Sequence, residues 1–433
     1  MISIPEVLFK NRVVCLFILF IVVTASSCAT KRPMWAVTIT PTPEAVEAAM
    51  DQDPYFPYRG DINPVNLPQF EPPTRLRPCC VFGMDVKVDL TNIPVPLYRV
   101  INIVDKKKLG PHTYDSGFFG GYGTDRKAGS NENNGIVYTC QGGFIDTAHV
   151  RDYSDLTVFL FFEFFKNIGP SFDIELKGEL GPRVIAVDPV AIKGDKFERA
   201  RISTILASWT AYQLSLWHEI AQWHGYREFA IFSEAPSAYS VEDAYSNLLG
   251  ISIANGLIYS ALVFNDNQYA RNFDTWIKAA LLSLGAVSKK ESRLYMQRVD
   301  GHWWDSTQRL PEKFIVLKRN YEMSPVQTPF LATDFVDPGK GEIAPCSSDA
   351  IPKKLMIDDK LYGADISDKV HIRLFVDKVY RESFAPGTAF NTSPDAITPA
   401  EFKAIADADK KADTISLQKR GRLNGEKKKG SDK

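Results

Sequence analysis

Hydrophobic positions recur at helical spacing through the middle of the chain. The pattern predicts one helix over residues 146–167 and a second over residues 195–224. A third helix is expected to begin after Ser240, and a fourth covers residues 273–284. The first segment holds five phenylalanines between positions 159 and 165, a density that only a buried helix accommodates. These long helices are predicted to form the core.

Short stretches of alternating hydrophobic and polar residues flank the helices. They lie at residues 86–90, 97–104, 183–187 and 370–376, and each is long enough for one strand. The sequence TPAE at 398–401 has the N-cap, N1 proline and capping-box glutamate of a further helix. The predicted fold class is therefore α+β, with a mainly helical core of about four long helices and short flanking strands.

Composition indicates a folded protein without a strong overall charge. The chain has 433 residues, of which 45% are hydrophobic and 12% aromatic, enough to bury a substantial core. Lys and Arg number 51 against 52 Asp and Glu, so no long-range field would hold nucleic acid. We expect no nucleic-acid partner.

The first 27 residues have the pattern of a secretion signal. Two basic residues precede an apolar run at positions 13–24, which is shorter than the roughly 20 residues of a membrane span. The run ends in Ala-Ser-Ser before Cys28, which resembles the lipobox of bacterial lipoproteins. Acylated Cys28 would anchor the protein to the membrane, at about 0.8 kcal/mol per buried methylene. Ala29 resembles the residue type of outer membrane lipoproteins, so we expect a location in the bacterial cell envelope, facing the periplasm. In the alternative, a plain signal peptide, Cys28 is incidental.

The chain is expected to divide into a signal peptide and four further regions. Residues 28–78 form a lipidated tether without regular structure, because ten prolines lie between Pro33 and Pro78. Residues 79–335 form the globular α+β core. Residues 336–400 form an extension with short strands, and residues 401–433 form a helix followed by a basic, disordered tail.

Four cysteines follow Cys28 and could form disulfides in an oxidising periplasm. The adjacent Cys79 and Cys80 rarely bond to each other, because that ring is strained. We expect one bond from this pair to Cys140 or Cys346. Buried free thiols are the alternative.

Three titratable residues share one stripe of the first predicted helix. At about 100° per residue, Asp146, His149 and Asp152 fall within an arc of about 120°. Imidazole and carboxylate groups suit zinc or a similar transition metal, so all three are candidate metal ligands. In the alternative, Asp146 caps the helix, Asp152 pairs with Arg151 or caps a neighbour, and His149 is a hydrogen-bonded core residue.

The second long helix carries His218 and Glu219 near its end. These begin like the zinc motif HExxH, but Gln222 occupies the position of the second histidine, and His224 points about 120° away. We therefore expect His218 to be a metal ligand or an orienting group, and Glu219 to be a general acid or base with its pKa raised by burial. In the alternative, Glu219 caps a neighbouring helix. His224 is explained instead by its position at the C-terminal end of the helix, where the helix dipole favours a cation.

A loop and the beginning of the third predicted helix follow the second long helix. Ser240 as N-cap, with Glu242 and Asp243 in the first turn, is ordinary helix electrostatics. Glu234 in the preceding loop has no such role, so it is a second candidate catalytic residue.

Several short segments resemble a bacterial lipoprotein family, domain of unknown function 4056. They include GGFID at 142–146, HVRD at 149–152, WHEI at 217–220 and YSNLLG at 245–250, and the resemblance covers roughly residues 75–335. It implies an exported, anchored protein and supplies no catalytic residues.

The residues themselves predict a pocket in which the stripe around His149 faces His218 and Glu219. Such a pocket would bind a divalent, zinc-like metal that activates water while Glu219 moves protons. The expected substrates are peptidoglycan, lipid head groups or peptides. The alternative is a non-catalytic envelope module that binds a partner or glycan, in which these groups pair with backbone and arginine. A separation above about 8 Å between His149 and His218 would exclude one shared metal.

Overall fold

The computed structural model describes residues 37–52, 67–74, 76–77, 81–88, 98–100, 102–116, 132–228, 233–335, 345–347 and 349–421. The chain divides into two units, Met1–Val37 and Thr38–Lys433, and nearly all described residues belong to the second. The predicted signal peptide, Cys28, the pair Cys79 and Cys80, and the basic tail lie outside them. In the part of the chain that is described, no helix is long and apolar enough to cross a membrane.

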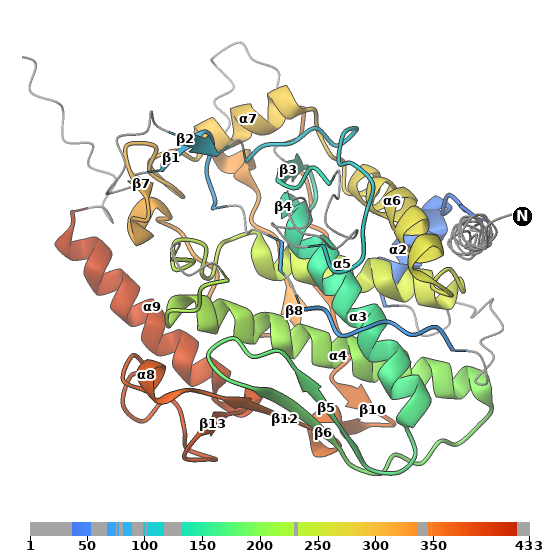
Figure 1. Cartoon of the computed structure of the whole chain (residues 1–433). Coiled ribbons are helices and arrows are strands. Elements are labelled where there is room, and N and C mark those ends of the chain that lie inside the picture. The colour runs from blue at the N-terminus through green and yellow to red at the C-terminus, as the bar shows by residue number, and fades with distance from the viewer. Residues whose placement is uncertain are drawn as a thin grey trace, which may run out of the picture. The chain divides into compact units, whose positions relative to one another are not determined.

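The second unit has an α+β fold, as predicted (Figure 1). Eight α-helices lie within the described ranges, more than the expected four. They are α2 Pro43–Met50, α3 Thr147–Asn167, α4 Lys196–Trp223, α5 Asp243–Tyr259, α6 Asp266–Ser283, α7 Lys289–Arg298, α8 Lys378–Arg381 and α9 Phe402–Lys419. The four central helices of the sequence prediction correspond to α3, α4, α5 and α6, and the capping box of Thr398 and Glu401 precedes α9.

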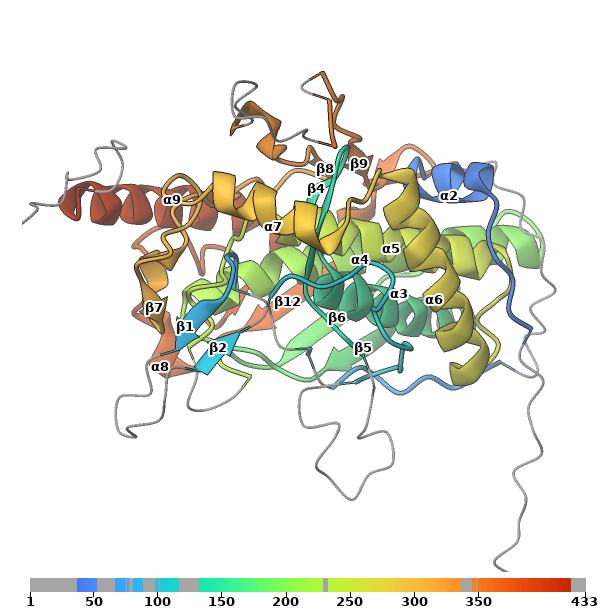
Figure 2. The same cartoon turned by 90° about the horizontal axis from the view of Figure 1, so that it is seen from above.

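The core lies where α3, α4 and α5 pack together, as both views show (Figures 1 and 2). All residues of α5 except its last are buried, because apolar residues are spread over all sides of the helix and leave no polar face for solvent. Its Gly250 allows close packing on α3, since a Cβ there would lie 2.3 Å from the carbonyl oxygen of Val150. Side chains on the facing sides of these three helices are therefore held close together by the packing.

A four-stranded antiparallel sheet joins distant parts of the chain. Its order is β13-β12-β6-β5, with β5 Phe172–Leu176, β6 Arg183–Val187, β12 Val370–Phe375 and β13 Ala396–Ile397. Ile174, Ile185 and Ile372 are in register and buried. The expected C-terminal extension thus completes a sheet that the core region begins.

The remaining strands form small sheets. These are β2-β1-β7 (Tyr98–Val100, Val86–Val88, Arg309–Leu310), β3-β4 (Ile136–Thr139, Gly143–Asp146), β8-β9 (Val326–Gln327, Leu355–Met356) and β10-β11 (Lys360–Leu361, Ala364–Asp365). The β3-β4 hairpin runs directly into α3, so it fixes where that helix begins.

Two sequence expectations are corrected. Part of the expected tether is α2, which begins after the N-cap Thr42 and packs on α5 and α6, because Val46, Ala49 and Met50 form a buried apolar face. The expected disulfide from Cys79 or Cys80 is also wrong. Cys140 and Cys346 bond to each other, although 206 positions separate them, because the hairpin turn carrying Cys140 lies against the chain around Cys346.

Candidate metal centre

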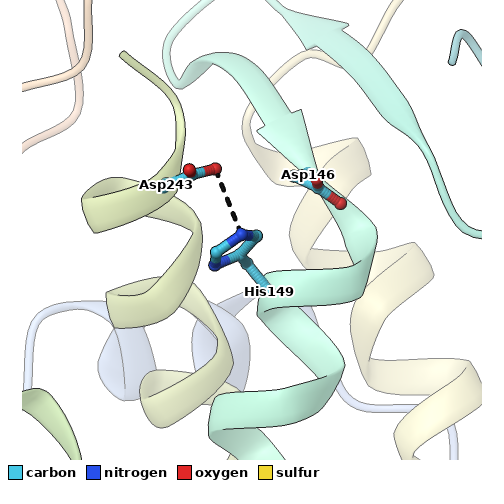
Figure 3. Close-up of side chains that lie close together, drawn as sticks. All are labelled: Asp146, His149 and Asp243. Carbon is cyan, nitrogen blue, oxygen red and sulfur yellow. Dashed lines mark ion pairs between the residues drawn. The ribbon is translucent and has the colours of Figure 1, made fainter. Parts of the chain in front are cut away.

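Asp146, His149 and Asp243 meet where α3 and α5 begin (Figure 3). Each offers one ligand atom, and these atoms lie within 4.8 Å of one another. All three residues are at most 2% exposed. Asp146 is the N-cap of α3, where its carboxylate accepts from the N–H of Ala148 at 2.7 Å, and its own N–H donates to Ser246 of α5 at 2.9 Å.

The ring of His149 is oriented so that Nε2 faces Asp243. Its Nδ1 lies 2.8 Å from the Asn247 side-chain oxygen, so Nδ1–H donates there and Nε2 carries the lone pair. Burial, together with the positive His218 nearby, lowers the pKa of His149 to about 3. The imidazole is therefore neutral, which is the state that binds metals.

The distance between the His149 ring and the Asp243 carboxylate fits a bound cation. Nε2 of His149 lies 3.4 Å from Oδ1 of Asp243, and neither atom has a hydrogen-bond partner among the described residues. Two ligands at about 2.0–2.1 Å on a tetrahedral zinc lie about 3.3 Å apart. The bond from His149 to Asn247 is also the kind of outer contact that orients a ligating histidine.

Glu219 of α4 extends this buried group. Its Oε2 accepts from the Tyr239 N–H at 2.6 Å, whereas its Oε1 has no hydrogen-bond partner in the described structure. Burial raises the pKa of Glu219 to about 7, and burial, together with the negative charges of Glu242 and Glu219, raises the pKa of Asp243. A carboxylate that titrates near neutral pH can accept a proton from water, so the geometry suits the base predicted from sequence.

His218 lies beside the cluster as a cation. Its ring centroid is 6.2 Å from that of His149, within the limit set above for a shared metal. Its Nδ1 lies 3.0 Å from Glu179. Burial opposes the charge, but the hydrogen bond and charge of Glu179 outweigh it and raise the pKa of His218 to about 9. As an imidazolium it has no lone pair, so this arrangement places it next to the ligand group rather than in it.

Two other predicted site residues have different partners. Asp152 binds Arg77, through the guanidinium at 2.7 Å and the backbone N–H at 3.1 Å. Of the predicted stripe only Asp146 and His149 share the cluster, because Asp152 lies further along α3, where Arg77 is its partner. Both oxygens of Glu234 accept hydrogen bonds, from the Glu228 N–H at 2.8 Å and the Gln222 side chain at 3.3 Å.

Sequence reasoning missed Asp243 and Glu242. Both are 2% exposed, and Glu242, rather than the expected Ser240, is the N-cap residue of α5 and makes no side-chain capping bond. Its Oε2 accepts from the Ser240 hydroxyl at 2.6 Å, and burial raises its pKa to about 8. The available signal was that α5 is apolar along its length, so acids at its start could not face solvent.

The cluster is closed to solvent in this conformation. One cavity on the described surface is lined by residues such as Gln52, Arg201 and Asn255, and a second by Lys106 and Glu291 among others. Neither is lined by the candidate ligands. A substrate would reach them only after a conformational change that exposes them.

A family model described as a protein of unknown function (DUF4056) matches residues 67–333. This range contains the candidate ligands Asp146, His149 and Asp243, and Glu219. No curated protein and no solved structure matches the chain.

Proposed function

The chain belongs to the DUF4056 family, whose description names no activity, and we propose that it is an envelope lipoprotein with a metal-dependent hydrolase site. The observation that carries this proposal is the 3.4 Å approach of His149 Nε2 to Asp243 Oδ1. A neutral imidazole lone pair facing a buried carboxylate is unfavourable unless a proton or a cation lies between them. Zinc or a similar divalent ion matches this donor set.

Each residue of the candidate site has a role in the proposed hydrolysis. Asp146, His149 and Asp243 would hold the ion, which would lower the pKa of a bound water molecule. Glu219 Oε1 accepts the proton, since the pKa of this group is about 7. The imidazolium of His218, held by Glu179, offers positive charge to a developing anion.

Envelope location and substrate class belong to the same proposal. The lipobox before Cys28 supports acylation and membrane attachment. The disulfide between Cys140 and Cys346 supports an oxidising compartment such as the periplasm. Peptidoglycan, lipid head groups and peptides are the substrates within reach of a protein anchored there.

The second candidate function is a non-catalytic envelope protein that binds a partner or glycan and uses the same metal structurally. The closed state favours it, since the candidate ligands are at most 2% exposed. Structural metal sites are typically closed, whereas catalytic sites keep a position open to water. Hydrolysis by the metal-loaded protein decides between the two.

Metal analysis of the purified protein tests the proposal. We expect about one equivalent of zinc, and a loss of affinity of about 100-fold or more in His149→Gln and in Asp243→Asn. His371→Gln is the matched control, because His371 has a side chain 48% exposed and lies on β12. Metal-free wild-type protein, or full affinity in both cluster variants, would refute the metal site.

A further inference from the structure

Tyr239 connects the candidate base Glu219 to helix α9. Its backbone N–H donates to Glu219 Oε2 at 2.6 Å, and its hydroxyl donates to Asp409 Oδ2 at 2.8 Å. All three residues are at most 5% exposed. Because Oε2 is held by this N–H, the other oxygen of Glu219 remains for chemistry.

The backbone of Tyr239 is in the left-handed region, with φ of +56°. A bulky residue adopts this conformation only when its surroundings impose it. Here the conformation is imposed by hydrogen bonds to the carbonyl groups that precede Tyr239 and to the carbonyl group of Tyr239 itself. Arg319 donates to the carbonyl oxygens of Pro236, at 3.3 Å, and of Ala238. Asn320 N–H donates to the carbonyl oxygen of Tyr239 itself at 2.7 Å.

The side chain of Tyr239 is held from α9. Asp409, its acceptor, also lies 3.3 Å from Nε2 of His224 at the end of α4. The Tyr239 ring packs against Tyr321, with centroids 4.6 Å apart. Helix α9 follows the part of the chain that the family model matches, so this anchor is an addition to the matched region.

We propose that Tyr239 is a positioning residue for Glu219, and that α9, through Asp409, holds Tyr239 in the conformation that aims its N–H at the carboxylate. The inference rests on the proposed role of Glu219 as base. Without the anchor only the contacts of Arg319 and Asn320 hold this conformation, so the Tyr239 N–H leaves the Glu219 carboxylate more often.

Hydrogen exchange of the Tyr239 amide measures this contact directly. We expect Tyr239→Phe, which removes only the hydroxyl, to speed exchange of that amide about tenfold, the equivalent of one hydrogen bond to a charged group. Tyr362→Phe is the matched control, because that hydroxyl also binds a carboxylate, Glu198 at 2.6 Å, but at a surface position. Unchanged protection in Tyr239→Phe would overturn the proposal.

Substitution on α9 separates positioning from general packing. Asp409→Leu removes the acceptor and should speed exchange of the Tyr239 amide, whereas Asp409→Asn keeps an acceptor oxygen and should restore protection. Equal exchange in the two variants would also overturn the proposal. The measurement needs no metal, so a protein that binds none would refute the proposed function while the positioning of Glu219 is still decided.

Discussion

At the scale of single residues, buried charges in this protein are of two kinds. Arg77 is 2% exposed and lies 2.6 Å from Glu132 and 2.7 Å from Asp152, so opposite charge surrounds it. Glu219 and Asp243 are equally deep, yet one oxygen of each lacks a hydrogen-bond partner in the described ranges. Burying a charge costs free energy unless a partner compensates it. The second group therefore requires protons or a cation, which is why it, rather than the arginine network, is the candidate site.

Lys313 provides a pH-dependent stability that can be measured by itself. Its Nζ lies 2.8 Å from the centroid of the Trp223 ring, and burial, together with positive Arg319, lowers its pKa from 10.5 to about 7. Between these values the unfolded chain binds a proton here that the folded chain does not, so stability rises with pH. Relative to Lys313→Met, we expect the wild-type protein to gain up to about 1.4 kcal/mol per pH unit in urea unfolding between pH 7 and 10.

The control for this experiment is Lys166→Met, at an exposed position. It should leave the pH dependence of unfolding as in the wild type. A constant difference between wild type and Lys313→Met across the range would mean that the folded protein keeps this amine protonated.

At the scale of elements, the close contact of α3 and α5 places Asp146 and His149 beside Asp243. Gly250→Ala tests this contact, because the new Cβ would lie 2.3 Å from the Val150 carbonyl oxygen. Alanine favours a helix by about 1 kcal/mol over glycine, but separating the helices should cost more. We expect net destabilisation of about 1–3 kcal/mol in urea unfolding, and weaker metal binding.

Leu282→Ala on α6 is the control for a change within a helix, since that side chain is 72% exposed. It should change stability by less than about 0.5 kcal/mol. If Gly250→Ala is instead more stable than wild type, the helices can separate without cost and do not fix the cluster.

The sequence predicts the long buried helices well, because their hydrophobic positions repeat over many residues. It predicts short elements poorly, because they show few such repeats. Helices α3 and α4 are long and almost wholly buried on their core sides, so their hydrophobic spacing located both within a few residues. The short α2 was missed, because surrounding prolines outweighed one buried face. In the cluster, Asp146 and His149 are near neighbours in sequence, whereas Asp243 comes from another helix. An acid in a first turn has an ordinary explanation, so only packing reveals its partner.

At the scale of the whole molecule, segments beyond the family-matched range complete the structure. Strand β12 pairs with β6, and α9 anchors Tyr239 and thereby the backbone that holds Glu219. The site and the C-terminal region are therefore joined by a shared sheet and by the hydrogen bond from Tyr239 to Asp409.

The Cys140–Cys346 bond should contribute strongly to the stability of the fold. It closes a loop across 206 positions, and chain entropy alone assigns such a loop on the order of 5 kcal/mol. For a protein of this size, reduction should lower Tm by about 5 °C. Dithiothreitol should therefore destabilise the wild type in calorimetry, whereas a Cys140→Ser/Cys346→Ser variant should melt low with or without it. A wild-type Tm that ignores reductant would mean that the two sulfurs are not bonded, and one support for an oxidising compartment would be lost.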